Sequence, residues 1–250
     1  MALRRYHQHF SHLHGFFVKE MAVLWDAFLS RQKVEGLDGS LLEIGVFRGK
    51  SAGMLALHTR EEETLTLIEI DDCLDEAAAL IDLQCDGKVN PLKHHSGSPE
   101  IKQWSEGEES NYRWIHIDGD HTAKGVLSDL ELADNLLADH GIICMDDFFS
   151  PMYPQITFAT CDYIREHADR LTIFLTGWNK AYLCRPRFAN ERMLHYVKDQ
   201  LADDLIHRDV RKFTLYKTDY PEPYNCFGIG IIFPGRRIKG LDSNPDTVII

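Results

Sequence analysis

Short runs of apolar residues alternate with segments of helical periodicity along most of the chain. Four of these runs predict buried strands, at Leu41–Ile44, Leu65–Ile70, Trp114–Ile117 and Ile142–Met145. The clearest helix runs from about Thr122 to Ala138. We expect its buried face to hold Val126, Leu127, Leu130, Ala133, Leu136 and Leu137. Strands separated by helices predict an α/β fold with a mostly parallel, doubly wound sheet.

The two ends of the chain depart from this alternation. An amphipathic helix is predicted from Phe16 to Phe28, and a second helix from Phe188 to Leu205. Leu171–Leu175 and Lys180–Cys184 form β-like runs around a four-residue turn, which predicts a hairpin and therefore one antiparallel edge strand. The expected organisation is an N-terminal helical cap over 1–36, a catalytic domain over 37–184, and a C-terminal extension over 185–250 packed on the same domain.

Composition excludes several classes of protein. The 250 residues are 44% apolar, enough for a full core, and the net charge of −12 disfavours nucleic acid and anionic membranes as partners. No apolar run is long enough for a membrane helix, and the start lacks a secretory signal, so we expect a cytoplasmic protein. Six scattered cysteines form no Cys-x-x-Cys motif. A histidine cluster at His7, His9, His12 and His14 could bind a metal, although a solvated helix face is the better interpretation.

Acidic residues follow the predicted strands. Ligands bind open parallel sheets outside the carboxyl ends of the strands, and carboxylates gathered there repel each other unless a cation or ligand hydroxyls share the site. The acidic strand ends are Glu43, Glu69, Asp71, Asp72, Asp118, Asp120, Asp146 and Asp147. This end of the sheet is therefore the expected functional site.

The segment from Gly45 to Ser51 is a glycine-bounded turn between a strand and a helix. It has three residues between Gly45 and Gly49-Lys50, where a P-loop needs four, and Phe47 occupies a position where the dinucleotide fingerprint needs glycine. A phosphate loop and a purely structural turn are the less favoured alternatives.

The ordered motifs resemble those of class I S-adenosylmethionine-dependent methyltransferases with a Rossmann-like fold. The motifs are Glu43-x-Gly45-x-x-x-Gly49-x-Ser51-Ala52, then Leu67-Ile68-Glu69-Ile70, then Gly97-Ser98. The metal-dependent O-methyltransferases, which act on catechols and macrolide sugars, are most similar. The resemblance implies that Glu43, Gly45, Gly49 and Ser51 lie at the methionine part of the cofactor. It also implies that Glu69 binds the ribose and Ser98 lies beside the adenine, with Asp118 next to the cofactor.

Three aspartates form a candidate metal site. Asp118 ends one predicted strand and Asp146-Asp147 end the next, 28 residues later, which is enough for one crossover. Oxygen ligands without cysteine suit Mg²⁺ or another hard divalent cation, and the resemblance implies metal ligation by these three residues. Helix and turn capping by the same aspartates is the alternative.

His121 and Asp120 are the candidate general bases, and His121 is favoured. The resulting expectation is a Mg-assisted O-methyltransferase of a small natural-product or sugar-like hydroxyl compound. A metal-independent N- or C-methyltransferase is the alternative, and a P-loop-like nucleotide-binding protein is less favoured. Whether the chain forms a homo-oligomer stays open. Candidates for an aromatic acceptor wall, each of which could equally be core, are Trp25, Trp178, Tyr216, Tyr220, Tyr224 and Phe227.

Overall fold

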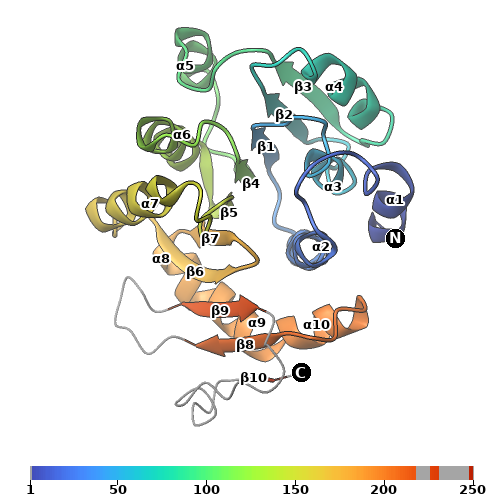
Figure 1. Ribbon diagram of the computed structural model, residues 1–250, viewed down its shortest axis with the longest axis vertical. Helices are drawn as coiled ribbons and strands as arrows, with labels where there is room; N and C mark the ends of the chain where they lie inside the picture. The colour runs from blue at the N-terminus through green and yellow to red at the C-terminus, as the bar shows by residue number, and fades with distance from the viewer. Residues whose placement is uncertain (1, 218–225, 231–247, 250) are drawn as a thin grey trace.

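A ten-stranded sheet forms the centre of the molecule (Figure 1). The computed structural model describes residues 2–217, 226–230 and 248–249. The strand order is β10-β8-β9-β6-β7-β5-β4-β1-β2-β3. The strands are β1 (Ser40–Ile44), β2 (Thr64–Ile68), β3 (Lys88–Leu92), β4 (Tyr112–Ile117), β5 (Leu137–Met145), β6 (Thr172–Gly177), β7 (Lys180–Cys184), β8 (Thr214–Lys217), β9 (Phe227–Gly230) and β10 (Val248–Ile249).

Five strands, β3, β2, β1, β4 and β5, pair in parallel, which confirms the predicted mostly parallel sheet. Their register brings the strand ends level. Ile44 pairs with Ile68 on one side and Ile117 on the other, and Ile117 pairs with Met145. The residues that follow these four therefore emerge side by side at one edge, where the acidic motifs were expected to meet.

The other half of the sheet is mixed. The predicted hairpin is confirmed: β7 runs antiparallel to both β5 and β6, and Trp178 and Asn179 turn it with positive φ angles of 48° and 66°. The sheet then continues through β9, β8 and β10, which were not predicted as strands. β9 is only four residues long and contains two glycines, so its hydrophobic pattern is too short to identify a strand.

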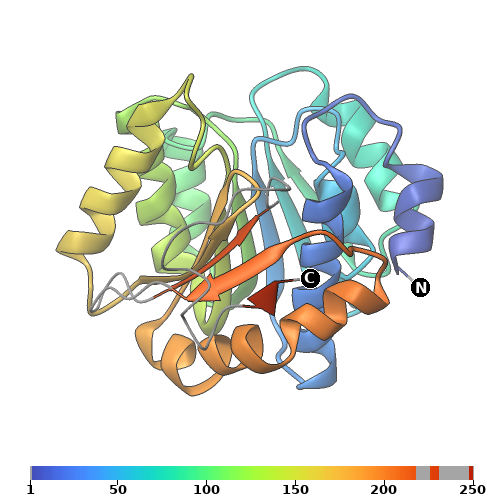
Figure 2. The same cartoon turned by 60° about the horizontal axis from the view of Figure 1, so that its bottom comes forward.

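Helices cover both faces of the sheet. Figures 1 and 2 show α5, α6 and α7 on one face, with α2, α3 and α4 on the other. Their bounds are α2 (Lys19–Val34), α3 (Ala52–Ala56), α4 (Leu74–Asp82), α5 (Pro99–Glu106), α6 (Ala123–Leu136) and α7 (Pro154–Glu166). Each face has its own apolar core. The crossover helix predicted from Thr122 is α6, but Leu127 was wrongly assigned to its buried face: its side chain is 40% exposed.

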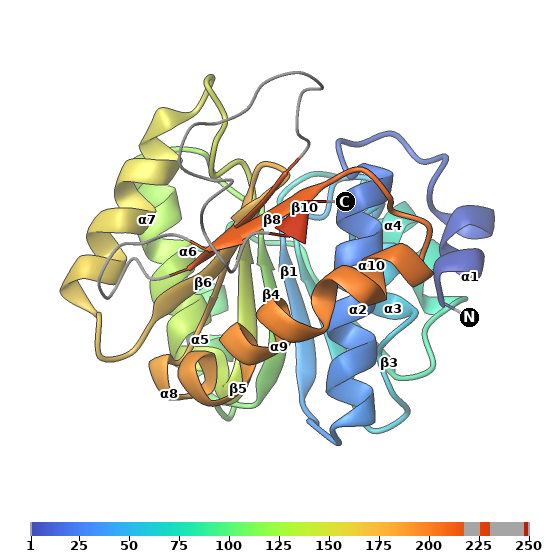
Figure 3. The same cartoon turned by 90° about the horizontal axis from the view of Figure 1, so that it is seen from below.

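The N- and C-terminal additions contact each other. Figure 3 shows α10 lying across α2. Asp26 of α2 joins them, because its carboxylate binds His58 Nε2 at 2.9 Å and Arg208 Nε at 2.7 Å. The single helix expected from Phe188 to Leu205 is wrong, since the chain breaks it near Gln200, where φ is −135°. The pieces are α8 (Pro186–Phe188), a π-helical turn (Ala189–Met193), α9 (Leu194–Asp199) and α10 (Leu201–His207).

The additional helix at the start, α1 (Ala2–His9), packs Tyr6 into the core, and His7 on the same helix is exposed, as a solvated helix face predicts. Two of the aromatic candidates, Trp25 and Phe227, are buried core residues, whereas Tyr220 and Tyr224 lie outside the described residues. Within the described part of the chain, no helix combines the length and apolar character needed to cross a membrane.

Candidate functional site

A cavity of about 890 Å³ opens at the carboxyl ends of the parallel strands. Its walls come from the turn after β1, the ends of β2, β4 and β5, and the loop after β3. The segment between α1 and α2 adds a further wall. Four apolar side chains at its edge are exposed: Phe16, Phe47, Ile70 and Met152. The cavity thus combines an apolar rim with an acidic floor.

The glycine turn is folded around Glu69. One carboxylate oxygen of Glu69 accepts hydrogen bonds from the backbone N–H groups of Val46 and Phe47, at 2.9 and 2.8 Å. The other oxygen accepts from the N–H groups of Ile70 and Asp71. Glu69 therefore orders the turn at the edge of the cavity, and these four N–H groups occupy the roughly four acceptor positions of its two oxygens.

Gly45 is required by a close approach of two strands. Its φ is +85°, and a Cβ atom there would lie 1.9 Å from the Asp118 carbonyl oxygen. The glycine thus lets the turn pass directly over the end of β4 and keeps Asp118 beside it. Gly49, with φ of +79°, faces Ala77 and Ile81 of α4, so its role in the structure is to let the turn pack on that helix.

Three of the other predicted cofactor residues have different surroundings. Ser51 lines the cavity and donates a hydrogen bond to Glu43, whose side chain is fully buried beneath it. Ser98 caps the N-terminus of α5 by accepting from the Ile101 N–H, and the structure does not bring it into the cavity wall. Its neighbours His95 and Ser96 line the wall instead.

Asp118, His121 and Asp147 form the centre of the floor. His121 Nε2 lies 3.5 Å from Asp118 Oδ1 and 3.3 Å from Asp147 Oδ2, and its ring stacks on Tyr153 with centroids 4.3 Å apart. Asp118, followed by the other nearby carboxylates, raises the pKa of His121. These three side chains offer ligand atoms within 4.8 Å of one another, the spacing that one cation needs.

Asp146 lies beside them with cationic partners of its own. Its Oδ2 accepts from the Lys180 ammonium and lies 3.3 Å from His116 Nε2. Burial alone would raise the pKa of Asp146, but the Lys180 charge outweighs it and holds that pKa well below its usual range. His116 is buried between Asp146 and Glu43; burial opposes its charge, yet Glu43 and Asp146 raise its pKa to about 9.

Asp120 lies at the cavity edge but is occupied locally. Its two oxygens accept from the backbone N–H and the hydroxyl of Thr122, both at 2.9 Å. The backbone hydrogen bond from Thr122 is the largest cause that lowers the pKa of Asp120. Asp120 therefore stabilises the turn that begins α6, and of the two candidate bases His121 faces the other site residues more directly.

Several site residues were missed by the sequence analysis. They are His14, Phe16, Phe17, His95, Ser96, His116, Met152, Tyr153, Asn179 and Lys180. Only Lys180 and His116 gave a usable signal, because each is a charged or titratable side chain within a short run that is mostly apolar. The others come from loops whose approach to the cavity depends on the folded chain.

Comparisons with known proteins agree with this geometry. Residues 42–148 match a family model described as a methyltransferase domain. The chain is similar in fold to CalS11, a TDP-rhamnose 3′-O-methyltransferase of calicheamicin biosynthesis, with 12% identity and a TM-score of 0.54 over 73% of this chain and 92% of that one. The O-methyltransferase NovP gives 15% identity and a TM-score of 0.50 over 66% and 80%.

A third similar structure is cofactor-bound Rv0187 from MTB, with 16% identity and a TM-score of 0.50 over 73% of this chain and 86% of that one. No curated protein matches the chain. At these identities the structures show the fold, and the family match identifies the domain that contains the glycine turn, Glu69 and the three aspartates. Residues 42–148 therefore form a methyltransferase domain, and the chain has the fold of the O-methyltransferases CalS11 and NovP.

Proposed function

We propose that this protein is an O-methyltransferase that uses S-adenosylmethionine and Mg²⁺ to methylate a hydroxyl of a small natural-product or sugar-like acceptor. The observation that carries the proposal is the convergence of Asp118, Asp147 and His121 on one cavity wall, beside the glycine turn. The similar folds of CalS11 and NovP, both described as O-methyltransferases, support the choice of oxygen as the acceptor atom.

Cofactor binding is assigned to the part of the cavity between the glycine turn and the loop after β3. Glu69 would accept the two ribose hydroxyls in exchange for N–H bonds that its oxygens accept from the turn. Ser51 and the Gly45 turn border the region for the methionine part, while His95 and Ser96 border the region for the adenine. The bound cofactor supplies an electrophilic methyl group on a sulfonium, so these residues have mainly to orient it.

The residues of the floor fit a hard divalent cation. Asp118 and Asp147 present carboxylate oxygens to the same space, and His121 Nε2 between them is buried without a hydrogen-bond partner. Asp146 adjoins this pair and completes the proposed ligand set of three aspartates. Mg²⁺ would supply Lewis-acid activation of the acceptor hydroxyl.

His121 is the proposed base, and Asp120 is the alternative. Its ring is fixed by the stack on Tyr153, and the Gln155 amide donates to its backbone carbonyl at 2.7 Å, so Nε2 is held toward the floor. A base held in this way can accept the proton of a hydroxyl placed between the metal ligands and the methyl donor. Asp120 would first have to release Thr122.

The apolar rim suggests how the acceptor is held. Phe16 and Met152 are 94% and 72% exposed at the mouth of the cavity, where they place apolar surface close to the acidic floor. An acceptor with an apolar body and a polar hydroxyl end would cover them and reach the acidic floor. This arrangement favours a natural product over a small polar metabolite.

Calorimetric titration with S-adenosylhomocysteine, with ATP as the control ligand, tests the cofactor assignment. Micromolar or tighter binding of the homocysteine compound and none of ATP is expected, whereas ATP binding alone would overturn the proposal. A panel of hydroxylated acceptors, assayed with Mg²⁺ and with EDTA, then tests the reaction. Full activity in EDTA would overturn the metal requirement, and no activity on any hydroxylated acceptor would favour the metal-independent N- or C-methyltransferase.

A further inference from the structure

Lys180 is a fully buried cation directly beneath the proposed metal site. It begins β7, next to the hairpin turn, and its side chain has no exposed area. Its ammonium donates to Asp146 Oδ2, and it lies 5.7 Å from the ring centres of both Phe17 and Trp25. A fully buried lysine side chain is rare unless its ammonium has a partner. The position of Lys180 therefore depends on the Asp146 carboxylate and the two aromatic rings.

The three aspartates are consequently unequal. Asp146 Oδ2 has two cationic neighbours, Lys180 and His116, and its Oδ1 accepts the Asp147 N–H at 2.7 Å. Asp147 instead accepts from the neutral amide of Asn179 at 2.6 Å. Among the described residues, Asp118 and Asp147 share the His121 ring and form no ion pair with a lysine or arginine, so the charge of Asp146 is compensated to a greater extent than that of the other two.

We propose that Lys180 competes with the divalent cation for Asp146 and so keeps the metal affinity of the site low. The inference rests on the proposed metal site and assigns Lys180 as a positioning residue. Under this proposal, Asp118 and Asp147 provide most of the free energy of metal binding, while Asp146 stays in its ion pair with Lys180. A unit positive charge a few ångströms from a divalent ion opposes its binding strongly in a partly buried site.

Mn²⁺ binding, followed by electron paramagnetic resonance or calorimetry on the full chain without substrate, tests the competition. Lys180→Met should tighten Mn²⁺ binding at least ~10-fold, because the opposing charge is gone. Lys102→Met makes the same change of net charge on the exposed surface of α5 and should alter the affinity less than ~2-fold in 0.15 M salt. Equal Mn²⁺ affinity of the wild type and Lys180→Met would overturn the inference.

A charge-neutral double variant guards against a folding defect. Asp146→Asn combined with Lys180→Met replaces the buried pair by neutral side chains of similar size, a change that proteins often tolerate. We expect it to keep Mn²⁺ affinity within ~3-fold of the wild type, whereas Asp147→Asn should lose more than ~30-fold. If the double variant loses as much as Asp147→Asn, then Asp146 is a full ligand and the inference is wrong.

S-adenosylhomocysteine titration of the same samples separates this inference from the proposed function. If the wild type and every variant bind S-adenosylhomocysteine but no Mn²⁺, both the metal site and the role of Lys180 are refuted. The methyltransferase assignment would then still stand. If the wild type does not bind S-adenosylhomocysteine, the cofactor assignment itself is refuted.

Discussion

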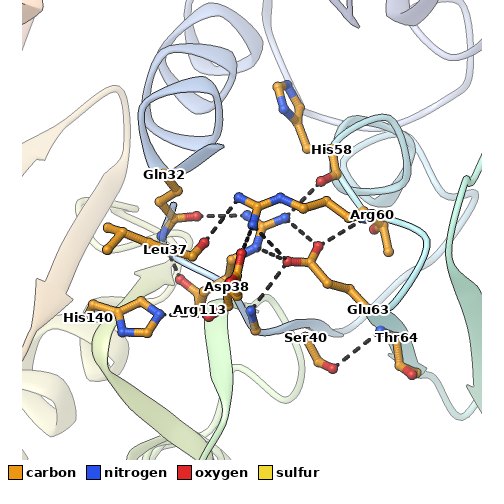
Figure 4. Close-up of polar contacts among 12 residues, drawn as sticks. Gln32, Leu37, Asp38, Ser40, His58, Arg60, Glu63, Thr64, Arg113 and His140 are labelled. Carbon is orange, nitrogen blue, oxygen red and sulfur yellow. Dashed lines mark hydrogen bonds and ion pairs between the residues drawn. The ribbon is translucent and has the colours of Figure 1, made fainter. Parts of the chain in front are cut away.

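The two ends of the parallel strands differ in how their buried charged groups are paired. At the amino end, Arg113 of β4 is completely buried, and all of its nitrogen atoms are hydrogen-bonded (Figure 4). It binds both carboxylate oxygens of Glu63, at 2.8 and 2.7 Å, the Gln32 amide and the His58 carbonyl. This network links α2, the segment after α3 and β4, and all three guanidinium nitrogen atoms donate within it.

At the carboxyl end the polar groups are only partly paired. His121 Nε2 and Glu43 Oε2 are buried without a hydrogen-bond partner, and His121 Nε2 lies 3.5 Å from Asp118 Oδ1 and 3.3 Å from Asp147 Oδ2. Unpaired buried polar groups reduce stability. Such atoms also occur at the amino end, as at Arg60 Nε, so the carboxyl end is distinguished by an unpaired group, His121 Nε2, on a residue that lines the cavity.

The largest expected effect comes from Asp118→Asn, which changes one atom at the carboxyl end. It removes a charge from the proposed metal ligands and should lower kcat by ~1,000-fold or more, equivalent to about 4 kcal/mol. Steady-state kinetics and S-adenosylhomocysteine titration check this. Cofactor affinity should change less than tenfold, and an unchanged kcat would contradict the assignment.

At the amino end, Arg113→Met should lower stability and leave catalysis unchanged. It leaves Glu63 buried without its cation, which should lower the free energy of unfolding by about 3–5 kcal/mol. Urea denaturation measures this, and activity per folded molecule should be preserved. Arg187→Met is the matched control, because the exposed Arg187–Glu191 pair should contribute less than about 1 kcal/mol. If both variants lower the free energy of unfolding by a similar amount, the buried Arg113 network is no more stabilising than the exposed Arg187–Glu191 pair.

His121→Gln sharpens the assignment within the site. The glutamine cannot act as a base, so kcat should fall ~100-fold. Asp120→Asn keeps an oxygen that can accept from Thr122 and should reduce kcat by less than ~10-fold if Asp120 only orders the turn. The reverse order of the two effects in the same assay would identify Asp120 as the base.

Glu69→Gln tests whether the turn and the cofactor share one carboxylate. The amide would turn an NH₂ group toward backbone N–H donors, so S-adenosylhomocysteine affinity should fall ~10-fold through a loss of about 1–3 kcal/mol. Calorimetry measures this change. Asp71→Asn, also at the cavity but not bonded to the turn amides of Val46 and Phe47, is the comparison and should have a smaller effect.

The smallest effect is expected from His58 at the structural end. Burial, the largest influence, lowers the pKa of His58, although Asp26 opposes it. The unfolded chain, in which the histidine pKa is about 6.5, therefore binds more protons in mildly acidic solution. Stability from this group is complete above that pH and declines as the pH falls below it. His58→Gln should flatten this part of the curve of urea midpoint against pH; an unchanged slope would contradict the assignment.

Much of the fold followed from pattern alone. Apolar runs in β1, β2, β4 and β5, with a helical segment such as α6 between them, specify the parallel crossovers. The positions of site residues were predictable where the residue directly follows a predicted strand or lies at its end, as for Glu69, Asp118 and Asp146. Strand β3, Lys88–Leu92, was missed because its side chains are only partly buried and one of them is proline.

The sequence by itself determined strands β1, β2, β4 and β5, the hairpin of β6 and β7, the glycine turn and the meeting of acidic strand ends, because periodicity and chain direction are local properties that fix where each strand points. Only the tertiary structure decided how those acids are paired. Lys180 reaches Asp146 from an antiparallel strand, and Phe16 reaches the cavity from the N-terminal segment. Such contacts join residues far apart in the chain, and the balance of burial against charge exists only once the interior is closed to water.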